Sequence, residues 1–273
     1  MQTIKARMQM VMDRGEKVLV SGVPIGYPDL DTTRRIVEIY IRSGIDLVEF
    51  SMPSPAPYID TKTIADSNIS ALQKEPNWDR HLEALRKVRQ DFPQEPFYMM
   101  AYADFIRGCG VERFVKTLRE IGVESLEFPD KQQQEPELWG QLDGLLGAAG
   151  IDRTYIFHHP FDQGFLAQVK DKVKGFVLLQ SFADPAGKRP SVAPENKSII
   201  ASMRTAGLTM PIILGYGINA PERVKEAAEA GADGVIVGTA MIDRISKGDY
   251  DGLSSFIREM KAATRRTKMG TRA

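Results

Sequence analysis

Three segments of the chain share one arrangement of hydrophobic and polar positions. In each of them an amphipathic stretch ends at a glycine, an acidic residue follows two places later, and a short apolar run comes next. The glycine fits the position just after a helix, where a left-handed backbone is needed, and the apolar run is typical of a short buried strand. This repeat, in Gly44–Phe50, Gly122–Phe128 and Gly231–Val237, indicates helices that alternate with strands.

Further apolar runs complete the alternating pattern. They predict five more strands, Val18–Val20, Phe97–Met100, Tyr155–Phe157, Phe176–Leu179 and Ile212–Leu214. Helical periodicity fills the intervals, at about 31–43, 78–91, 111–121, 135–149, 162–171, 193–206, 220–230 and 250–265. Eight alternating units over 273 residues predict an α/β fold, the (β/α)₈ TIM barrel, with a doubly wound sheet as the alternative. Without a linker or a shift in composition, residues 1–273 are expected to form a single domain.

Composition and charge narrow the class of protein. Lys plus Arg equals Asp plus Glu, at 36 each, so no bulk field favours nucleic acid or an acidic membrane as a partner. The single cysteine fits a reducing cytoplasm, and no apolar run is long enough to span a membrane. The N-terminus lacks the apolar region of a signal peptide. Its apolar residues instead predict an extra helix on the barrel floor, with one face formed by Ile4, Met8, Val11 and Met12.

Glycine turns after the seventh and eighth strands suggest a phosphate site. In such barrels these two loops commonly hold a phosphate, because glycine lets backbone N–H groups approach its oxygens and a helix N-terminus attracts an anion. The candidates are Gly217, Gly238 and Thr239. Tight strand-to-helix turns without a ligand are the alternative. Asn219 with Glu222 resembles a helix cap and is interpreted as structural.

A carboxylate on the second strand is the main candidate for acid–base chemistry. Strand alternation places Leu47 and Glu49 on one face, and the other face must be apolar to meet the helices. Glu49 is therefore expected to point into the barrel mouth, where burial would raise its pKa toward the range useful for proton transfer. A buried structural ion pair is the alternative. Asp60 follows in the next loop, and spacing alone allows either a site residue or a solvated aspartate.

Other polar residues are expected near the same mouth. Glu127 has the same place in its repeat as Glu49, so it should also point inward; a pair with Lys or Arg is the alternative. His158 and His159 end the fifth strand, and at most one of them should face the pocket. Two adjacent histidines lack zinc-ligand spacing, so no metal is expected. Tyr102 is predicted to be pocket wall, and His81 to lie on a helix surface.

Several motifs together carry a family resemblance. They are Ile25–Leu30, Glu49 with Pro53, Asp60–Ile64, Tyr102–Ala103, Gly110–Phe114, Pro129–Asp130, Gly215–Ile218 and Gly231–Gly238. Along nearly its whole length the chain resembles the tryptophan synthase α chain family. The resemblance implies a cofactor-free retro-aldol lyase that cleaves indole-3-glycerol phosphate to indole and glyceraldehyde 3-phosphate. It implies that Glu49 transfers the proton, that Asp60 holds the indole N–H, and that the phosphate is bound by Gly187, Gly217, Gly238 and Thr239.

The departures from that family concern the pocket for the ring. Gly22 replaces an aromatic that faces the indole, Glu127 a leucine, and Leu178 a tyrosine that supports the catalytic glutamate. A mobile-loop threonine is Ala186. Substrate contacts are therefore expected at Gly22, Tyr102, Glu127, His158 and Leu178, and the loops that dock the β subunit are altered. A β-like subunit and a homo-oligomer both remain candidate assemblies.

The leading hypothesis is a carbon–carbon lyase of this type, acting on a phosphate-bearing substrate. Its alternatives are a paralogue with a non-indole substrate, a phosphosugar isomerase and a non-catalytic regulatory barrel. An unpaired polar group at Glu127 and a missing aromatic at Gly22 predict poor cleavage of indole-3-glycerol phosphate. A replacement ring from Phe157 or Tyr27 would compensate.

Overall fold

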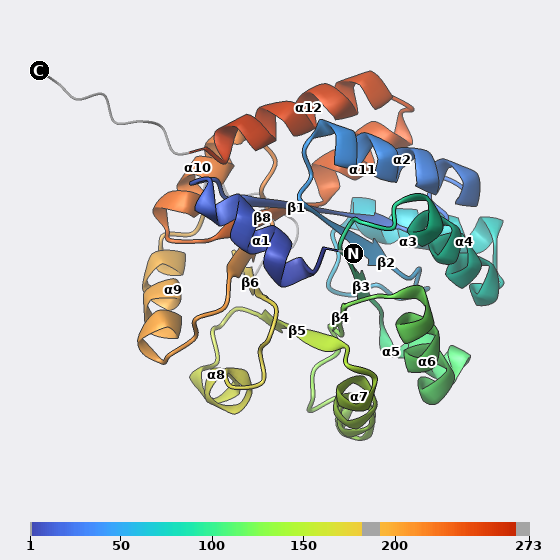
Figure 1. The fold of residues 1–273 in the computed structure, drawn as a ribbon, viewed down its shortest axis with the longest axis horizontal. Helices are drawn as coiled ribbons and strands as arrows, with labels where there is room; N and C mark the ends of the chain where they lie inside the picture. Colours follow the sequence, from blue (N-terminus) through green and yellow to red (C-terminus); the bar gives the residue numbers. More distant parts are fainter. Residues whose placement is uncertain (1, 182–191, 266–273) are drawn as a thin grey trace, which may run out of the picture.

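Eight parallel strands close into a barrel in the computed structural model, which describes residues 2–181 and 192–265 (Figure 1). Each strand pairs with its neighbours in chain order, and β8 pairs with β1. The strands are β1 Val18–Pro24, β2 Leu47–Ser51, β3 Phe97–Met100, β4 Ser125–Glu127, β5 Asp152–Phe157, β6 Val177–Gln180, β7 Ile212–Gly215 and β8 Gly234–Val237. The predicted barrel is thus confirmed.

Helices surround the barrel and connect successive strands (Figure 1). Nine correspond to predicted helices: α1 Ile4–Asp13, α2 Leu30–Ser43, α4 Trp78–Asp91, α6 Val111–Ile121, α7 Pro136–Ala149, α8 Gln163–Val169, α9 Glu195–Thr205, α10 Pro221–Glu229 and α12 Tyr250–Ala263. Three lie in the loops that follow strands β2, β3 and β8 and were not predicted: α3 Lys62–Lys74, α5 Ala103–Cys109 and α11 Thr239–Ser246. All three loops carry site candidates: Asp60 after β2, Tyr102 after β3, and Gly238 and Thr239 after β8.

The repeat seen in the sequence has a structural cause. Its glycines Gly44, Gly122 and Gly231 all adopt positive φ at the ends of helices, as a left-handed cap requires. The acidic residue two places later binds backbone amides at the entrance to the strands. Asp46 accepts a hydrogen bond from the Leu19 amide, and Asp233 accepts one from the Ile212 amide, each at 2.8 Å. The shared glycine and the acidic residue two places later therefore serve helix termination and strand packing.

Helix α1 covers the entrance end of the barrel. Its buried residues Ile4, Met8 and Val11 join a core cluster with Val18 and Tyr98 from the strands. Figure 1 shows α1 crossing over the strands. This end is closed by apolar packing, which leaves the carboxyl ends of the strands as the open mouth.

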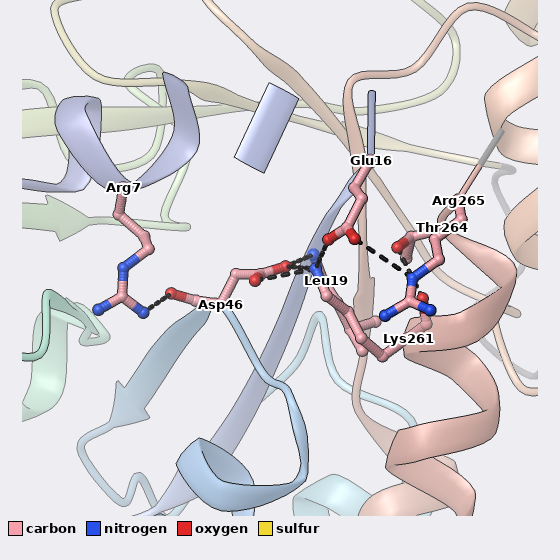
Figure 2. A network of polar contacts seen from close by, with 7 residues as sticks. All are labelled: Arg7, Glu16, Leu19, Asp46, Lys261, Thr264 and Arg265. Atoms are coloured by element: carbon pink, nitrogen blue, oxygen red, sulfur yellow. Dashed lines mark hydrogen bonds and ion pairs between the residues drawn. The ribbon is translucent and has the colours of Figure 1, made fainter. Parts of the chain in front are cut away.

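A polar network ties the last helix to the same end (Figure 2). The Lys261 ammonium group contacts both carboxylate oxygens of Asp46, at 2.9 and 2.7 Å, and a Glu16 oxygen at 3.0 Å. Arg265 pairs with the other oxygen of Glu16, and Arg7 donates to the carbonyl oxygen of Asp46. These contacts join α1, α12 and the starts of two strands, so they fix the C-terminal helix against the barrel.

The structure corrects the predicted position of His81. Its side chain is fully buried on the inner face of α4, beside Leu82 and Leu85. The two ring nitrogens lie 2.8 and 2.7 Å from the carbonyl oxygens of Ile25 and Glu75. The prediction of a surface position was wrong because this polar residue belongs to the helix face that packs inward.

Within residues 2–181 and 192–265, no helix combines the length and the apolar character needed to cross a bilayer.

Candidate active site

A cavity of about 440 Å³ lies among the residues that end the strands. Its walls come from both sides of the barrel. The side chains that carry chemistry are on β2, the loop after it, and β4, and the glycine turns after β7 and β8 lie in the same cavity. Among the predicted site residues, the lining includes Gly22, Glu49, Asp60, Glu127, Leu178, Gly217, Gly238 and Thr239. Gly187 and Ala186 lie outside the described residues.

Glu49 points into this cavity, as strand alternation predicts. In the barrel its neighbours in register are Gly22 on β1 and Tyr98 on β3. The Tyr98 hydroxyl donates a hydrogen bond to Oε2 of Glu49. Burial raises the pKa of the Glu49 carboxyl to about 7; the hydrogen bond from Tyr98 lowers it and the nearby Asp60 raises it. A carboxyl group with this pKa can both give and take a proton near neutral pH.

Tyr98 is a site residue that the sequence analysis missed. The tyrosine that supports the glutamate in the family was assigned to the position of Leu178, which has no hydroxyl. Here the neighbouring strand β3 supplies one instead. The Tyr98 ring is held at its other side by Phe176, with ring centroids 5.1 Å apart. Strand alternation could have placed Tyr98 among the inward-facing residues of β3, but its position opposite Glu49 comes from the register of the closed barrel.

Asp60 enters the cavity from the loop between β2 and α3. The Tyr102 hydroxyl donates to its Oδ2 at 2.8 Å. Burial raises the pKa of Asp60 to about 7, and the hydrogen bond from Tyr102 lowers it. Tyr102 itself is not among the lining residues, so its predicted place in the wall was wrong. It is buried next to the cavity and reaches Asp60 through its hydroxyl group.

Gly22 lines the cavity without opening space for a ring. A β-carbon placed on it would lie 2.8 Å from Oε1 of Glu49. The missing side chain therefore makes room for the catalytic candidate's carboxylate. The expectation that Gly22 leaves an open space in the pocket was wrong, because the Glu49 side chain from the neighbouring strand β2 occupies that space.

Glu127 also points inward, and it has no partner to balance it. Its side chain is 3% exposed, and its Oε2 receives no hydrogen bond from the described residues. The alternative of a pair with Lys or Arg is not found in the described part of the chain. Burial raises its pKa well above the usual range, and the charges of Glu49 and Asp60 raise it further. Burial and the two acidic neighbours therefore favour the protonated form of the Glu127 carboxyl group.

The phosphate candidates also line the cavity, at the turns that follow β7 and β8. Gly217 has a φ of 70°, and Gly238 and Thr239 form the N-terminus of α11. The Thr239 hydroxyl is 2.8 Å from that of Thr61, which precedes α3. The expected cap by Asn219 is absent: Ala220 is the N-cap of α10, Pro221 follows it, and Asn219 lines the cavity.

Tyr216 joins the phosphate side to the acid–base side. It has a positive φ of 69°, and its hydroxyl donates to the Ile59 carbonyl oxygen at 3.0 Å. This contact connects the turn after β7 to the loop that carries Asp60. Sequence patterns contain no signal for this contact, because it depends on how two loops of the closed barrel meet.

The remaining candidates lie outside the cavity lining. His158 contacts Oε1 of Gln180 at 3.2 Å, and burial lowers its pKa; Gln180, not His158, lines the cavity. Phe157 packs outward on Phe161 and Phe165, and Tyr27 does not line the cavity, so neither supplies a replacement ring. Among residues 2–181 and 192–265, no three His, Cys, Asp or Glu side chains are grouped to hold a metal.

Comparison with known sequences gives a consistent picture. A family model described as tryptophan synthase alpha chain matches residues 8–272. The tryptophan synthase alpha chain of Geobacter sp. (strain M21) is 34% identical over 252 residues, which are 92% of this chain and 91% of that protein. That of Synechocystis sp. (strain ATCC 27184 / PCC 6803 / Kazusa) is 32% identical over 267 residues, 96% of this chain and 99% of the relative.

Solved structures share the fold over the same extent. A chain of Mycobacterium tuberculosis tryptophan synthase aligns with a TM-score of 0.84 and 22% identity, covering 97% of this chain and 98% of that one. The tryptophan synthase subunit alpha of Legionella pneumophila str. Paris aligns with a TM-score of 0.84 and 21% identity, with the same coverage. At these identities the structures establish the fold, and the sequence matches establish the relationship. The chain belongs to the tryptophan synthase alpha chain family.

Proposed function

We propose that this protein is a carbon–carbon lyase that cleaves indole-3-glycerol phosphate, or a close analogue, to the free ring and glyceraldehyde 3-phosphate. The observation that carries the proposal is the presence of two carboxyl groups, Glu49 and Asp60, in one cavity. Both carboxyl groups line one cavity, both have a pKa raised to about 7, and each receives a hydrogen bond from its own tyrosine. Membership of the family supports the reaction class.

The reaction needs one group that gives and retakes a proton. Protonated Glu49 gives its proton to the ring carbon that bears the glycerol chain, and the Asp60 carboxylate accepts a hydrogen bond from the ring N–H as positive charge develops. Glu49 then takes the proton of the adjacent hydroxyl group. The O–H electron pair forms the aldehyde C=O, and the electrons of the breaking C–C bond return to the ring. The products are indole and glyceraldehyde 3-phosphate, with Glu49 again protonated.

The substrate phosphate is assigned to the turns after β7 and β8. Gly217 and Gly238 leave the backbone open to close approach, and the N-terminus of α11 begins at Thr239. The same assignment includes Gly187. A phosphate held there orients the rest of the substrate across the barrel toward Glu49 and Asp60.

A tryptophan synthase β-like subunit is the proposed partner, and the cytoplasm the proposed location. The structural relatives include tryptophan synthase itself. The loop that carries Asp60 exposes Tyr58, whose side chain is 51% exposed and whose hydroxyl donates to the Pro129 carbonyl oxygen. Tyr58 immediately precedes Ile59 and Asp60, which line the cavity, so a partner that covers this loop would control access to the site.

The direct test is the release of indole from indole-3-glycerol phosphate, alone and with a tryptophan synthase β subunit. We expect turnover without added cofactor, and formation of the phosphate ester from indole and glyceraldehyde 3-phosphate in the reverse direction. A protein that binds inorganic phosphate but shows neither reaction, with any ring tested, would be a binding barrel and would contradict the proposal.

A methyl group on Gly22 is expected to disturb the reaction more than the fold. In Gly22→Ala the new β-carbon would meet Oε1 of Glu49 at 2.8 Å, so the flexible carboxylate must move. A displacement of about 1 Å costs up to about 10²-fold in rate. We expect kcat/KM to fall by about 10- to 100-fold, while the free energy of unfolding changes by less than about 1 kcal/mol. The control Gly144→Ala, whose β-carbon meets nothing, should leave kcat/KM unchanged; because Gly144 lies within α7, the free energy of unfolding should rise by up to about 1 kcal/mol.

The pH dependence of the rate should show the effect of Tyr98 on the pKa of Glu49. The first step needs protonated Glu49 and ionised Asp60, so the rate should be bell-shaped with a maximum near pH 7. In Tyr98→Phe the hydrogen bond that favours the Glu49 carboxylate is lost, so the pKa of Glu49 rises. We expect the alkaline limb to move to higher pH and kcat to fall by about tenfold.

Tyr155→Phe is the control for this variant, because the Tyr155 ring packs outward on Trp139 and Phe165. Its pH profile should match that of the wild type. An unmoved alkaline limb in Tyr98→Phe would mean that Tyr98 does not act on Glu49.

A further inference from the structure

The carboxyl group of Glu127 is the feature of the cavity that the proposed reaction does not use. It lies on β4, is 3% exposed, and lines the same cavity as Glu49 and Asp60. Its Oε2 has no hydrogen-bond partner among the described residues. A buried polar atom without a partner costs free energy, so it calls for an explanation, and a ligand in the cavity would supply the missing partner.

The position of Glu127 places it at the end of the substrate remote from the phosphate. In the closed barrel β4 lies across from β8, and the phosphate turns follow β7 and β8. A molecule anchored at those turns and passing Glu49 therefore reaches β4 with its other end. The cavity there has apolar walls as well, from Met100, Ile156 and Leu178. The occupant is thus mostly apolar but faces one polar group.

The chemistry of Glu127 defines what that occupant must offer. Glu49 and Asp60 are acidic neighbours, and no Lys or Arg is paired with Glu127 in the described part of the chain. Burial and these two neighbours favour the protonated carboxyl group, which has one O–H donor and one C=O acceptor. A plain benzo ring satisfies neither of them, whereas a ring with a nitrogen or a hydroxyl group on its edge satisfies at least one.

We propose that Glu127 selects the leaving group: the natural substrate is a triose phosphate joined to an indole-like ring that bears a hydrogen-bonding nitrogen or oxygen on its outer edge. This inference rests on the proposed function for the reaction itself, and it changes the substrate from indole-3-glycerol phosphate to a polar-edged analogue. Glu127 is a specificity residue in this assignment, since Glu49 and Asp60 carry the chemistry.

The test compares indole with its hydroxy- and aza-derivatives on the wild type, Glu127→Leu and Glu127→Gln. Binding of each ring to the full-length protein, in the presence of inorganic phosphate, is measured by calorimetry. Condensation of each ring with glyceraldehyde 3-phosphate is measured separately. We expect the wild type to prefer at least one polar-edged ring over indole by about tenfold or more. Glu127→Leu should lose that preference and bind indole more tightly, and Glu127→Gln, which also donates and accepts, should keep it.

The two readouts separate this inference from the proposed reaction. A binding preference that depends on residue 127, without condensation of any ring, would leave the selection by Glu127 standing and contradict the lyase. Condensation with equal kcat/KM for indole and every polar ring would support the lyase reaction and contradict the selection by Glu127. The inference is overturned if Glu127→Leu keeps the wild-type order of rings, or if no ring binds while phosphate binding is intact.

Discussion

Glu49→Gln is expected to abolish turnover while the protein stays folded. The amide keeps the size of the carboxyl group and can still accept the hydrogen bond from Tyr98, but it cannot transfer a proton. General acid–base catalysis contributes about 10²- to 10⁴-fold, and here one group performs both proton transfers. We therefore expect kcat for ring release to fall by about 10³-fold or more, at the upper end of that range.

Two measurements give this result its meaning. Binding of inorganic phosphate by calorimetry should be unchanged, because the phosphate turns follow β7 and β8 whereas Glu49 lies on β2. Glu124→Gln is the matched control: Glu124 accepts a hydrogen bond from the Ile4 amide at the closed end of the barrel. That variant should turn over normally. Near-normal turnover in Glu49→Gln would remove Glu49 from the catalytic role.

Asp60→Asn should have the second largest effect, and a diagnostic pH profile. The amide can still accept the Tyr102 hydrogen bond but carries no negative charge for the ring N–H. Loss of one aligned electrostatic partner costs about 10²- to 10³-fold in kcat. The acid limb of the rate profile arises from protonation of Asp60, so this limb should disappear, while the alkaline limb set by Glu49 remains.

The control for this variant is Asp104→Asn. Asp104 accepts a hydrogen bond from Ser54 at 2.8 Å and does not line the cavity. It should retain wild-type kcat and both limbs of the profile. An Asp60→Asn enzyme that keeps the acid limb would show that another group controls activity at low pH.

In the acid–base site each of the two carboxyl groups therefore has its own tyrosine partner, Tyr98 for Glu49 and Tyr102 for Asp60. Tyr98 from β3 supports Glu49 where the family position, Leu178, cannot, and Gly22 provides the space that Glu49 occupies. Gly22 on β1 and Tyr98 on β3 therefore belong to one arrangement around the Glu49 carboxylate: the first leaves it space, and the second gives it a hydrogen bond. Single departures from a family pattern can therefore mislead when each is interpreted alone.

The amino-acid sequence by itself determined the barrel and the inward direction of Glu49 and Glu127. These follow from local periodicity: apolar runs, glycine caps and strand alternation depend on residues close together in the chain. The glycine turns after β7 and β8 and the loop position of Asp60 were also evident, because strand ends in a parallel barrel share one face. Helices α3, α5 and α11 were missed, since each lies within a loop that carries motif residues.

Only the tertiary structure decided which groups touch. Tyr98 and Glu49 are 49 residues apart, Tyr102 and Asp60 are 42 apart, and Tyr216 reaches Ile59 across 157 residues. The tertiary structure likewise determines that His81 is buried and that one Glu127 oxygen has no hydrogen-bond partner among the described residues. The physical reason is that strand register and helix packing place side chains from distant segments within hydrogen-bond distance. No local pattern contains that information, although the pKa values and the specificity of the site depend on it.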